Sequence, residues 1–161
     1  MDSDTFVYTT YIRTTPDELW QALTEPELTR RYWGVSFETT WTPGASMVWD
    51  ENGRRTVDPD QVVLEARPGR LLSYTWHTFT KDWADAVRLE QEAYELLTRE
   101  PRSRVTFVIE PSGDTVRLTV THGGLEPGGI IKGLIGEGWP ALISSLKSLL
   151  ETGEELPEPP R

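Results

Sequence analysis

The two histidines are the side chains of this chain best suited to proton exchange near neutral pH. His122 continues the every-second-residue apolar pattern that runs from Val116 to Val120, so we expect it on the same inward face of a strand. There its imidazole can act as an acid–base group or hydrogen-bond a ligand, which makes it the candidate catalytic residue. The alternative, which we favour, is a structural histidine bonded to a backbone carbonyl or to Trp139.

His77 is out of phase with Tyr74 and Trp76, which predicts a position on the outer face with no role in a site. The chain has no Cys, and no His/Asp/Glu cluster has the spacing of metal ligands, so we predict no metal site. The segment Gly136-Glu137-Gly138 lacks the third glycine of a dinucleotide fingerprint and does not follow a strand in a βαβ unit. We therefore expect no cofactor.

Candidate nucleophiles and paired catalytic acids are also few in the sequence. Ser144, Ser145 and Ser148 lie in the last apolar segment without a histidine–acid pair, so a hydrolase triad has no support. Asp58 and Asp60 flank a proline, a pattern typical of a turn rather than of paired catalytic acids. The sequence thus offers few groups for enzymatic acid–base work.

Large aromatic side chains are the more conspicuous feature, with seven Trp, five Tyr and four Phe. So many rings in a short chain either fill an unusually bulky core or line a cavity. Their number on inward-facing positions slightly favours the cavity. The candidate ligand-binding residues are Trp33, Met47, Trp49, Tyr74, Trp76, Phe107, His122 and Trp139.

A series of short strands and helices must position these side chains. Residues 6–13 alternate as a first strand, and the capping box formed by residues 15–18 predicts a helix directly after it. A second box at residues 24–27 predicts another short helix, which Gly34 ends. Strands separated by Pro- and Gly-containing turns are predicted at residues 36–41, 45–50, 62–67, 70–79, 104–110 and 115–122.

Helical spacing returns in two places. Residues 82–99 predict a helix inserted between two strands, and residues 139–152 predict a long last helix that Pro140 opens and Gly153 ends. The glycine-rich residues 123–138 predict a flexible loop in front of it. Residues 1–153 are therefore expected to form one domain, followed by a disordered Pro-rich tail at residues 154–161.

The net charge of −10, from 26 acidic and 16 basic residues, argues against nucleic-acid binding and against docking on anionic membranes. No apolar run approaches the ~20 residues of a membrane-spanning helix, and the first residues do not resemble a signal peptide. We expect a cytoplasmic protein.

The two ends of the chain are similar to one known family. Residues 12–27 together with Tyr32-Trp33-Gly34 resemble the opening of the START-like (SRPBCC) superfamily, in the branch related to the activator of the heat-shock-protein-90 ATPase. Residues 118–122, 138–140 and 146–151 resemble the closing signature of that branch. The resemblance implies an α+β helix-grip fold, in which an antiparallel sheet of about seven strands curls around the C-terminal helix and leaves a cavity. The inserted helix at residues 82–99 departs from the family's minimal pattern.

Three functions are compatible with these observations. The first, which we favour, is the binding of a small hydrophobic or aromatic molecule such as a lipid, polyketide or flavonoid. The second is an enzyme of the polyketide cyclase or dehydratase kind, with His122 as the acid–base group and Tyr74 as a donor. The third is an interaction protein that contacts a chaperone, a regulator or a second copy of itself, with residues 82–99 as the contact.

Overall fold

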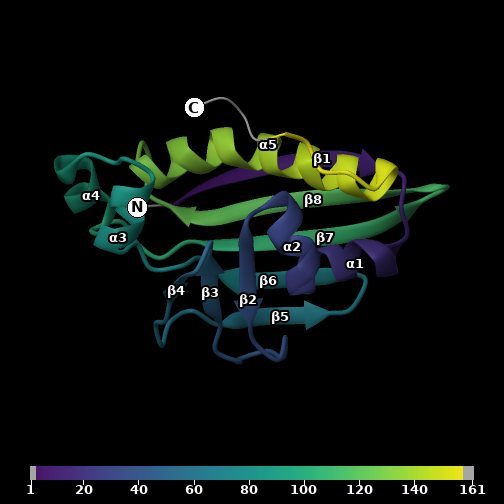
Figure 1. The fold of residues 1–161 in the computed structure, drawn as a ribbon, viewed down its shortest axis with the longest axis horizontal. Coiled ribbons are helices and arrows are strands. Elements are labelled where there is room, and N and C mark those ends of the chain that lie inside the picture. The colour runs from purple at the N-terminus through teal and green to yellow at the C-terminus, as the bar shows by residue number, and fades with distance from the viewer. Residues whose placement is uncertain (1–2, 158–161) are drawn as a thin grey trace.

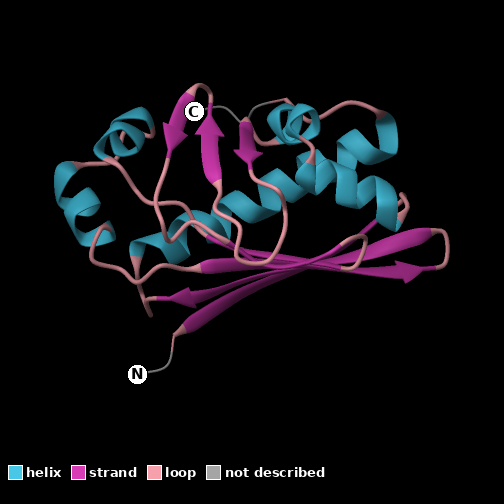
Figure 2. Ribbon diagram, turned by 90° about the horizontal axis from the view of Figure 1, so that it is seen from below, coloured by secondary structure: helices cyan, strands magenta, loops and turns pink. Residues whose placement is uncertain are grey.

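The computed structural model describes residues 3–157, which form eight strands and five helices. Five strands make an antiparallel sheet in the order β1-β8-β7-β6-β5, and three make a small sheet in the order β2-β3-β4. Helix α5 runs along one face of the large sheet, and the small sheet lies on the same side (Figures 1 and 2).

The strands are β1 (Asp4–Ile12), β2 (Val35–Glu38), β3 (Val48–Glu51), β4 (Arg54–Thr56), β5 (Val63–Arg67), β6 (Leu71–Thr75), β7 (Arg104–Ser112) and β8 (Thr115–Leu125). The helices are α1 (Pro16–Thr24), α2 (Pro26–Tyr32), α3 (Lys81–Ala86), α4 (Gln91–Leu97) and α5 (Ile130–Thr152). The predicted α+β helix-grip fold is confirmed, with one strand more than expected, the short β4.

The first helix starts as its sequence predicts. The hydroxyl of Thr15 accepts a hydrogen bond from the backbone N–H of Glu18 at 3.2 Å, and Pro16 occupies the first turn. The second capping box does not form, because the hydroxyl of Thr24 instead donates to the carbonyl of Trp20 at 2.8 Å. Helix α2 nevertheless begins at Pro26 and is followed by Gly34, whose φ of 77° suits glycine.

The core lies between the large sheet and α5. Alternate residues of β7 and β8, among them Phe107 and Leu118, are buried against the apolar stripe of α5 that includes Ile143 and Leu146. This is the period-two burial predicted for both strands. The middle of the sheet–helix interface is consequently filled by side chains.

The start of α5 differs from the prediction. The helix begins at Ile130, so the segment expected to be a flexible loop is mostly helical, and Pro140 lies inside the helix. Two causes are visible. Ile131, Ile135 and Trp139 recur every four residues and are all buried, so tertiary packing overrides the low helix propensity of the glycines between them. The first turn is also capped, because the carboxylate of Glu100 accepts from the backbone N–H of Ile130 at 2.8 Å.

The inserted segment is two short helices rather than one. Arg88, with a φ of 59°, breaks the predicted helix between α3 and α4. Both helices lie beside the N-terminal end of α5 (Figure 1).

Residues 154–157 are bonded to the domain, contrary to the predicted disorder of the tail. Arg31 forms an ion pair with Glu155 at 2.8 Å, and the backbone N–H of Leu156 donates to the hydroxyl of Ser145 at 3.1 Å. Residues 158–161 of the predicted tail lie outside the described residues. Within residues 3–157 none of the helices has the length and apolar character needed to cross a membrane.

Candidate functional site

A hollow of about 220 Å³ lies where β3, the segment after β6, α3 and the first turns of α5 meet. Five of the seven tryptophans line it, and we call it the tryptophan pocket. Val87 after α3 is 46% exposed and Leu134 on α5 is 42% exposed, so apolar side chains border the opening to solvent. The pocket is lined by Trp33, Val35, Trp49, Glu51, Trp76, His77, Phe79, Trp83, Val87, Ile131, Leu134, Ile135, Gly138, Trp139 and Leu142.

Most of the aromatic walls meet at steep angles, although the rings of Trp33 and Trp76 stack at 27° with centroids 6.0 Å apart. The rings of Trp33 and Trp49 are 5.9 Å apart at 83°, and those of Trp49 and Trp76 are 5.0 Å apart at 74°. Trp139 continues the wall on the helix side, with its ring 5.6 Å from that of Trp76. Edge-to-face contacts of this kind stabilise aromatic clusters, so each ring is held by its neighbours.

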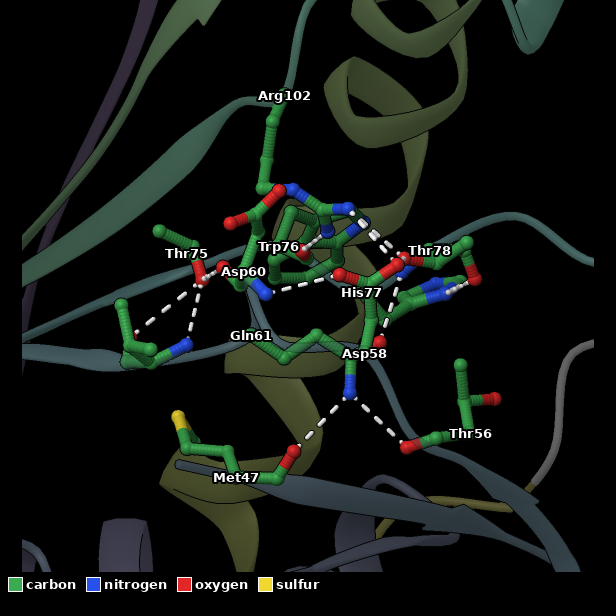
Figure 3. A network of polar contacts seen from close by, with 11 residues as sticks. Met47, Thr56, Asp58, Asp60, Gln61, Thr75, Trp76, His77, Thr78 and Arg102 are labelled. Carbon is green, nitrogen blue, oxygen red and sulfur yellow. Dashed lines mark hydrogen bonds and ion pairs between the residues drawn. The ribbon is translucent and has the colours of Figure 1, made fainter. Parts of the chain in front are cut away.

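The backbone of the Trp76 wall is fixed by a buried amide (Figure 3). Gln61 is fully buried, and its side-chain nitrogen donates to the carbonyls of Met47 at 3.0 Å and Thr56 at 2.9 Å. Its oxygen accepts from the backbone N–H of Thr78 at 2.9 Å. One side chain thus joins the small sheet to the segment that follows β6.

A charged pair supports the same segment from the other side (Figure 3). Arg102 donates to the carbonyl of Trp76 at 2.7 Å and to the hydroxyl of Thr78 at 2.8 Å, and its guanidinium is 3.5 Å from the carboxylate of Asp58. Asp58 accepts from the backbone N–H of Asp60 and from the hydroxyl of Thr78, and these bonds, with Arg102 nearby, lower its pKa. Asp58 and Asp60 therefore belong to a structural turn, as their spacing indicates.

His77 lines the pocket instead of facing outward. Strand β6 ends at Thr75, so the alternation on which the prediction depends stops before His77. Its Nδ1 is 2.8 Å from the carbonyl of Thr78, which can only accept, so Nδ1 carries the proton and Nε2 holds a lone pair. Among residues 3–157 the ring hydrogen-bonds through Nδ1 alone. Burial lowers the pKa of His77 to about 4, so the ring is neutral at pH 7.

Among the described residues that line the pocket, Glu51 is the only carboxylate, and it is not among the residues predicted from the sequence. It follows Trp49 by two residues on β3, and this period-two relation was the signal that could have found it. Its carboxylate accepts no hydrogen bond from residues 3–157, and its ion-pair partner, Arg54, is 4.0 Å away. Burial raises the pKa of Glu51, and Arg54 partly offsets this. The described lining contains no Lys or Arg.

His122 is fully buried below the pocket and does not line it. The indole N–H of Trp139 donates to its Nδ1 at 3.1 Å, so the neutral ring carries its proton on Nε2 and donates to the hydroxyl of Ser103 at 2.7 Å. Burial lowers the pKa of His122 to about 4. Both ring nitrogens are engaged, and the protonated Nε2 cannot accept a proton from Ser103. This geometry supports the structural role over the catalytic one.

The other predicted site residues divide into two groups. Trp33, Trp49, Trp76 and Trp139 line the pocket, whereas Met47, Tyr74 and Phe107 are at most 1% exposed and belong to the core. The sequence places all seven on inward faces, but only the packing of α3, β3 and α5 decides which of them border empty space. Within residues 3–157 no group of three His, Cys, Asp or Glu side chains could hold a metal ion.

The fold and the pocket define the class of this protein. An antiparallel sheet packed against a long C-terminal helix, with an apolar pocket beside that helix, is the arrangement of START-like helix-grip domains. The chain belongs to the family described as Activator of Hsp90 ATPase homolog 1-like protein, whose model matches residues 13–151. The resemblance of the two chain ends to this branch is thereby confirmed.

Solved structures share the fold. Protein MLL2253 from Mesorhizobium loti is 25% identical, with a TM-score of 0.70 over 91% of this chain and 96% of that chain. The Aha1 dimer from Colwellia psychrerythraea is 17% identical, with a TM-score of 0.68 over 93% of this chain and 98% of that chain. DynU16, a protein of the dynemicin biosynthetic locus, is 19% identical, with a TM-score of 0.65 over 94% of this chain and 49% of that chain. Among curated proteins no match was found.

Proposed function

We propose that the protein binds a small, largely apolar molecule with an aromatic or compact aliphatic group in the tryptophan pocket. The observation that carries this proposal is the gathering of five of the seven tryptophans around one hollow that opens to solvent. Ligand sites are typically concave, mostly apolar and fitted with a few polar groups. Glu51 and His77 are such polar groups here.

The size of the hollow limits the ligand. An apolar cavity of about 150 Å³ admits benzene, so the 220 Å³ of the tryptophan pocket suits a one- or two-ring molecule. A long lipid chain does not fit within this volume, and the middle of the sheet–helix interface is filled by residues such as Phe107 and Leu146. Among the ligands considered from the sequence, small aromatic compounds are therefore favoured over lipids. DynU16, which has the same fold, belongs to a biosynthetic locus, and this is consistent with a small-molecule ligand.

The glycines of α5 offer a direct test. Gly138 lines the pocket, and a Cβ added there meets no atom within 4 Å. Glycine inside a helix costs about 1 kcal/mol relative to alanine, and no close neighbour requires it at this position. Gly138→Leu therefore adds side-chain atoms at the edge of the pocket, starting from a Cβ in open space, and we expect the variant to be folded but to bind ligand at least about tenfold more weakly.

The indole N–H signals in a ¹H–¹⁵N spectrum provide the measurement. Naphthols, indoles and substituted phenols are titrated into the wild-type protein, and we expect shifts at Trp33, Trp49, Trp76 and Trp83. Gly133→Leu is the matched control, because Gly133 lies on the same helix, also has open space around its Cβ and does not line the pocket. Absence of shifts with the whole panel, or equal binding by Gly138→Leu and Gly133→Leu, contradicts the proposal.

A further inference from the structure

The walls of the tryptophan pocket are largely indole rings. Aromatic rings attract a cation placed within about 6 Å of the ring centre, and tryptophan does so most strongly. Trp33, Trp49 and Trp76 border the same volume of about 220 Å³, and their ring centroids lie 5.0 to 6.0 Å from one another. A compact cation in that volume can approach several rings at once, whereas in water it contacts none.

The charge of the lining also favours a cationic ligand. Glu51 is its one ionisable acid, and no Lys or Arg among the described residues lines the pocket to attract an anion. The carboxylate is partly buried, accepts no hydrogen bond from residues 3–157, and lies 4.0 Å from Arg54. Burying a carboxylate with so little compensation is unfavourable, and it raises the pKa of Glu51. A cation on the ligand stabilises such a carboxylate.

His77 adds a second acceptor. Its proton is on Nδ1, where the carbonyl of Thr78 accepts it, so the lone pair of Nε2 is able to accept a hydrogen bond from an N–H group. The ring is neutral at pH 7 and does not repel a cation. The rings of Trp49 and Trp83 lie 4.9 and 5.6 Å from it, so this acceptor is set among the aromatic walls.

We propose that the ligand of the tryptophan pocket carries an ammonium or quaternary ammonium group, which the indole faces and the carboxylate of Glu51 recognise together. This inference rests on the proposed function, since it names the chemistry of the molecule that the same pocket binds. The apolar part of the ligand then fills the side bordered by Val87, Leu134 and Ile135. The net charge of −10 adds a favourable long-range field for a cationic ligand.

Two ligands of nearly equal shape separate the effect of charge on affinity from the effect of size. In (3-hydroxyphenyl)trimethylammonium a nitrogen bearing the positive charge takes the place of the quaternary carbon of 3-tert-butylphenol. Both are titrated into the full chain, and dissociation constants are taken from the indole N–H shifts. We expect the cation to bind about tenfold more tightly than the neutral compound. Equal affinities, or tighter binding of 3-tert-butylphenol, overturn the inference and leave the proposed function intact. Absence of binding by both compounds and by the neutral aromatic panel overturns the proposed function itself.

The role of Glu51 is tested by Glu51→Gln, which keeps the shape of the side chain and removes its charge. We expect this variant to bind the cation about tenfold more weakly and to lose most of the preference for the cation over the neutral compound. Glu65→Gln is the matched control, because Glu65 also has an arginine partner at 4.0 Å but lies on β5 and does not line the pocket. If Glu51→Gln and Glu65→Gln bind the cation equally, Glu51 is not the counter-charge and the inference is wrong as stated.

Discussion

The indole N–H of Trp139 donates a hydrogen bond to Nδ1 of His122, and this bond joins α5 to β8 through two buried side chains. The same imidazole donates to Ser103, just ahead of β7, so it links three parts of the fold. Trp139 also forms part of the pocket wall. The orientation of that wall therefore depends on a histidine that does not touch the pocket.

His122→Ala is expected to lower the free energy of unfolding by about 2–4 kcal/mol. The substitution leaves the indole N–H of Trp139 buried without an acceptor and opens a cavity beside it. Urea denaturation at pH 7 measures the change. His122→Gln at this site serves as a second variant that keeps hydrogen-bonding groups, and a loss below about 1 kcal/mol in His122→Ala contradicts the structural role.

The stability of the protein is expected to fall as the pH drops from 7 to 5. His77 and His122 have folded-state pKa values of about 4, below the unfolded value of 6.5, so the unfolded state binds more protons in this range. At pH 5 each histidine then lowers the free energy of unfolding by roughly 2 kcal/mol relative to pH 7. Urea midpoints at half-unit pH steps measure this.

The contribution of His77 to this pH dependence of stability is measured with the variant His77→Phe. In His77→Phe one of the two titrating groups is gone, so about half of the loss between pH 7 and pH 5 should disappear. Phenylalanine suits the site because His77 packs against the rings of Phe79 and Trp83. An unchanged pH dependence in this variant contradicts the assignment.

Gln61→Leu is expected to destabilise the protein by about 2–4 kcal/mol. The near-isosteric change removes three hydrogen bonds and leaves the carbonyl of Met47 and the N–H of Thr78 without their buried partner. Increased hydrogen exchange at residues 76–78 is expected with it, because the amide fixes that backbone. Gln91→Leu, at an exposed position on α4, is the control and should change stability by less than about 0.5 kcal/mol.

Glu100→Ala is expected to fray the first turn of α5. The carboxylate of Glu100 accepts from the backbone N–H of Ile130 at 2.8 Å, and losing such a cap costs about 1 kcal/mol. Hydrogen exchange at residues 130–135 should accelerate while exchange at residues 143–150 stays unchanged. Glu126→Ala, which removes an exposed acid near the same turn, is the control. Equal exchange in both variants contradicts the capping role.

The sequence alone determined the elements whose signals are local. Thr15 and Pro16 specify the start of α1 because the cap is formed within four residues. The alternation through Phe107 and Leu118 identifies buried faces because a strand repeats every two residues. The family could be inferred from the order of the motifs at the two chain ends, and its model match confirms this.

Only the tertiary structure decided where α5 begins, which way His77 points and which rings border empty space. The cap of α5 comes from Glu100, thirty positions before Ile130, and no local pattern reveals such a contact. His77 lies beyond the end of β6, where period-two alternation no longer holds. Glu51 becomes part of a pocket because α3 and α5 close over β3, and the packing of distant elements, not the residue's own neighbours, creates that space.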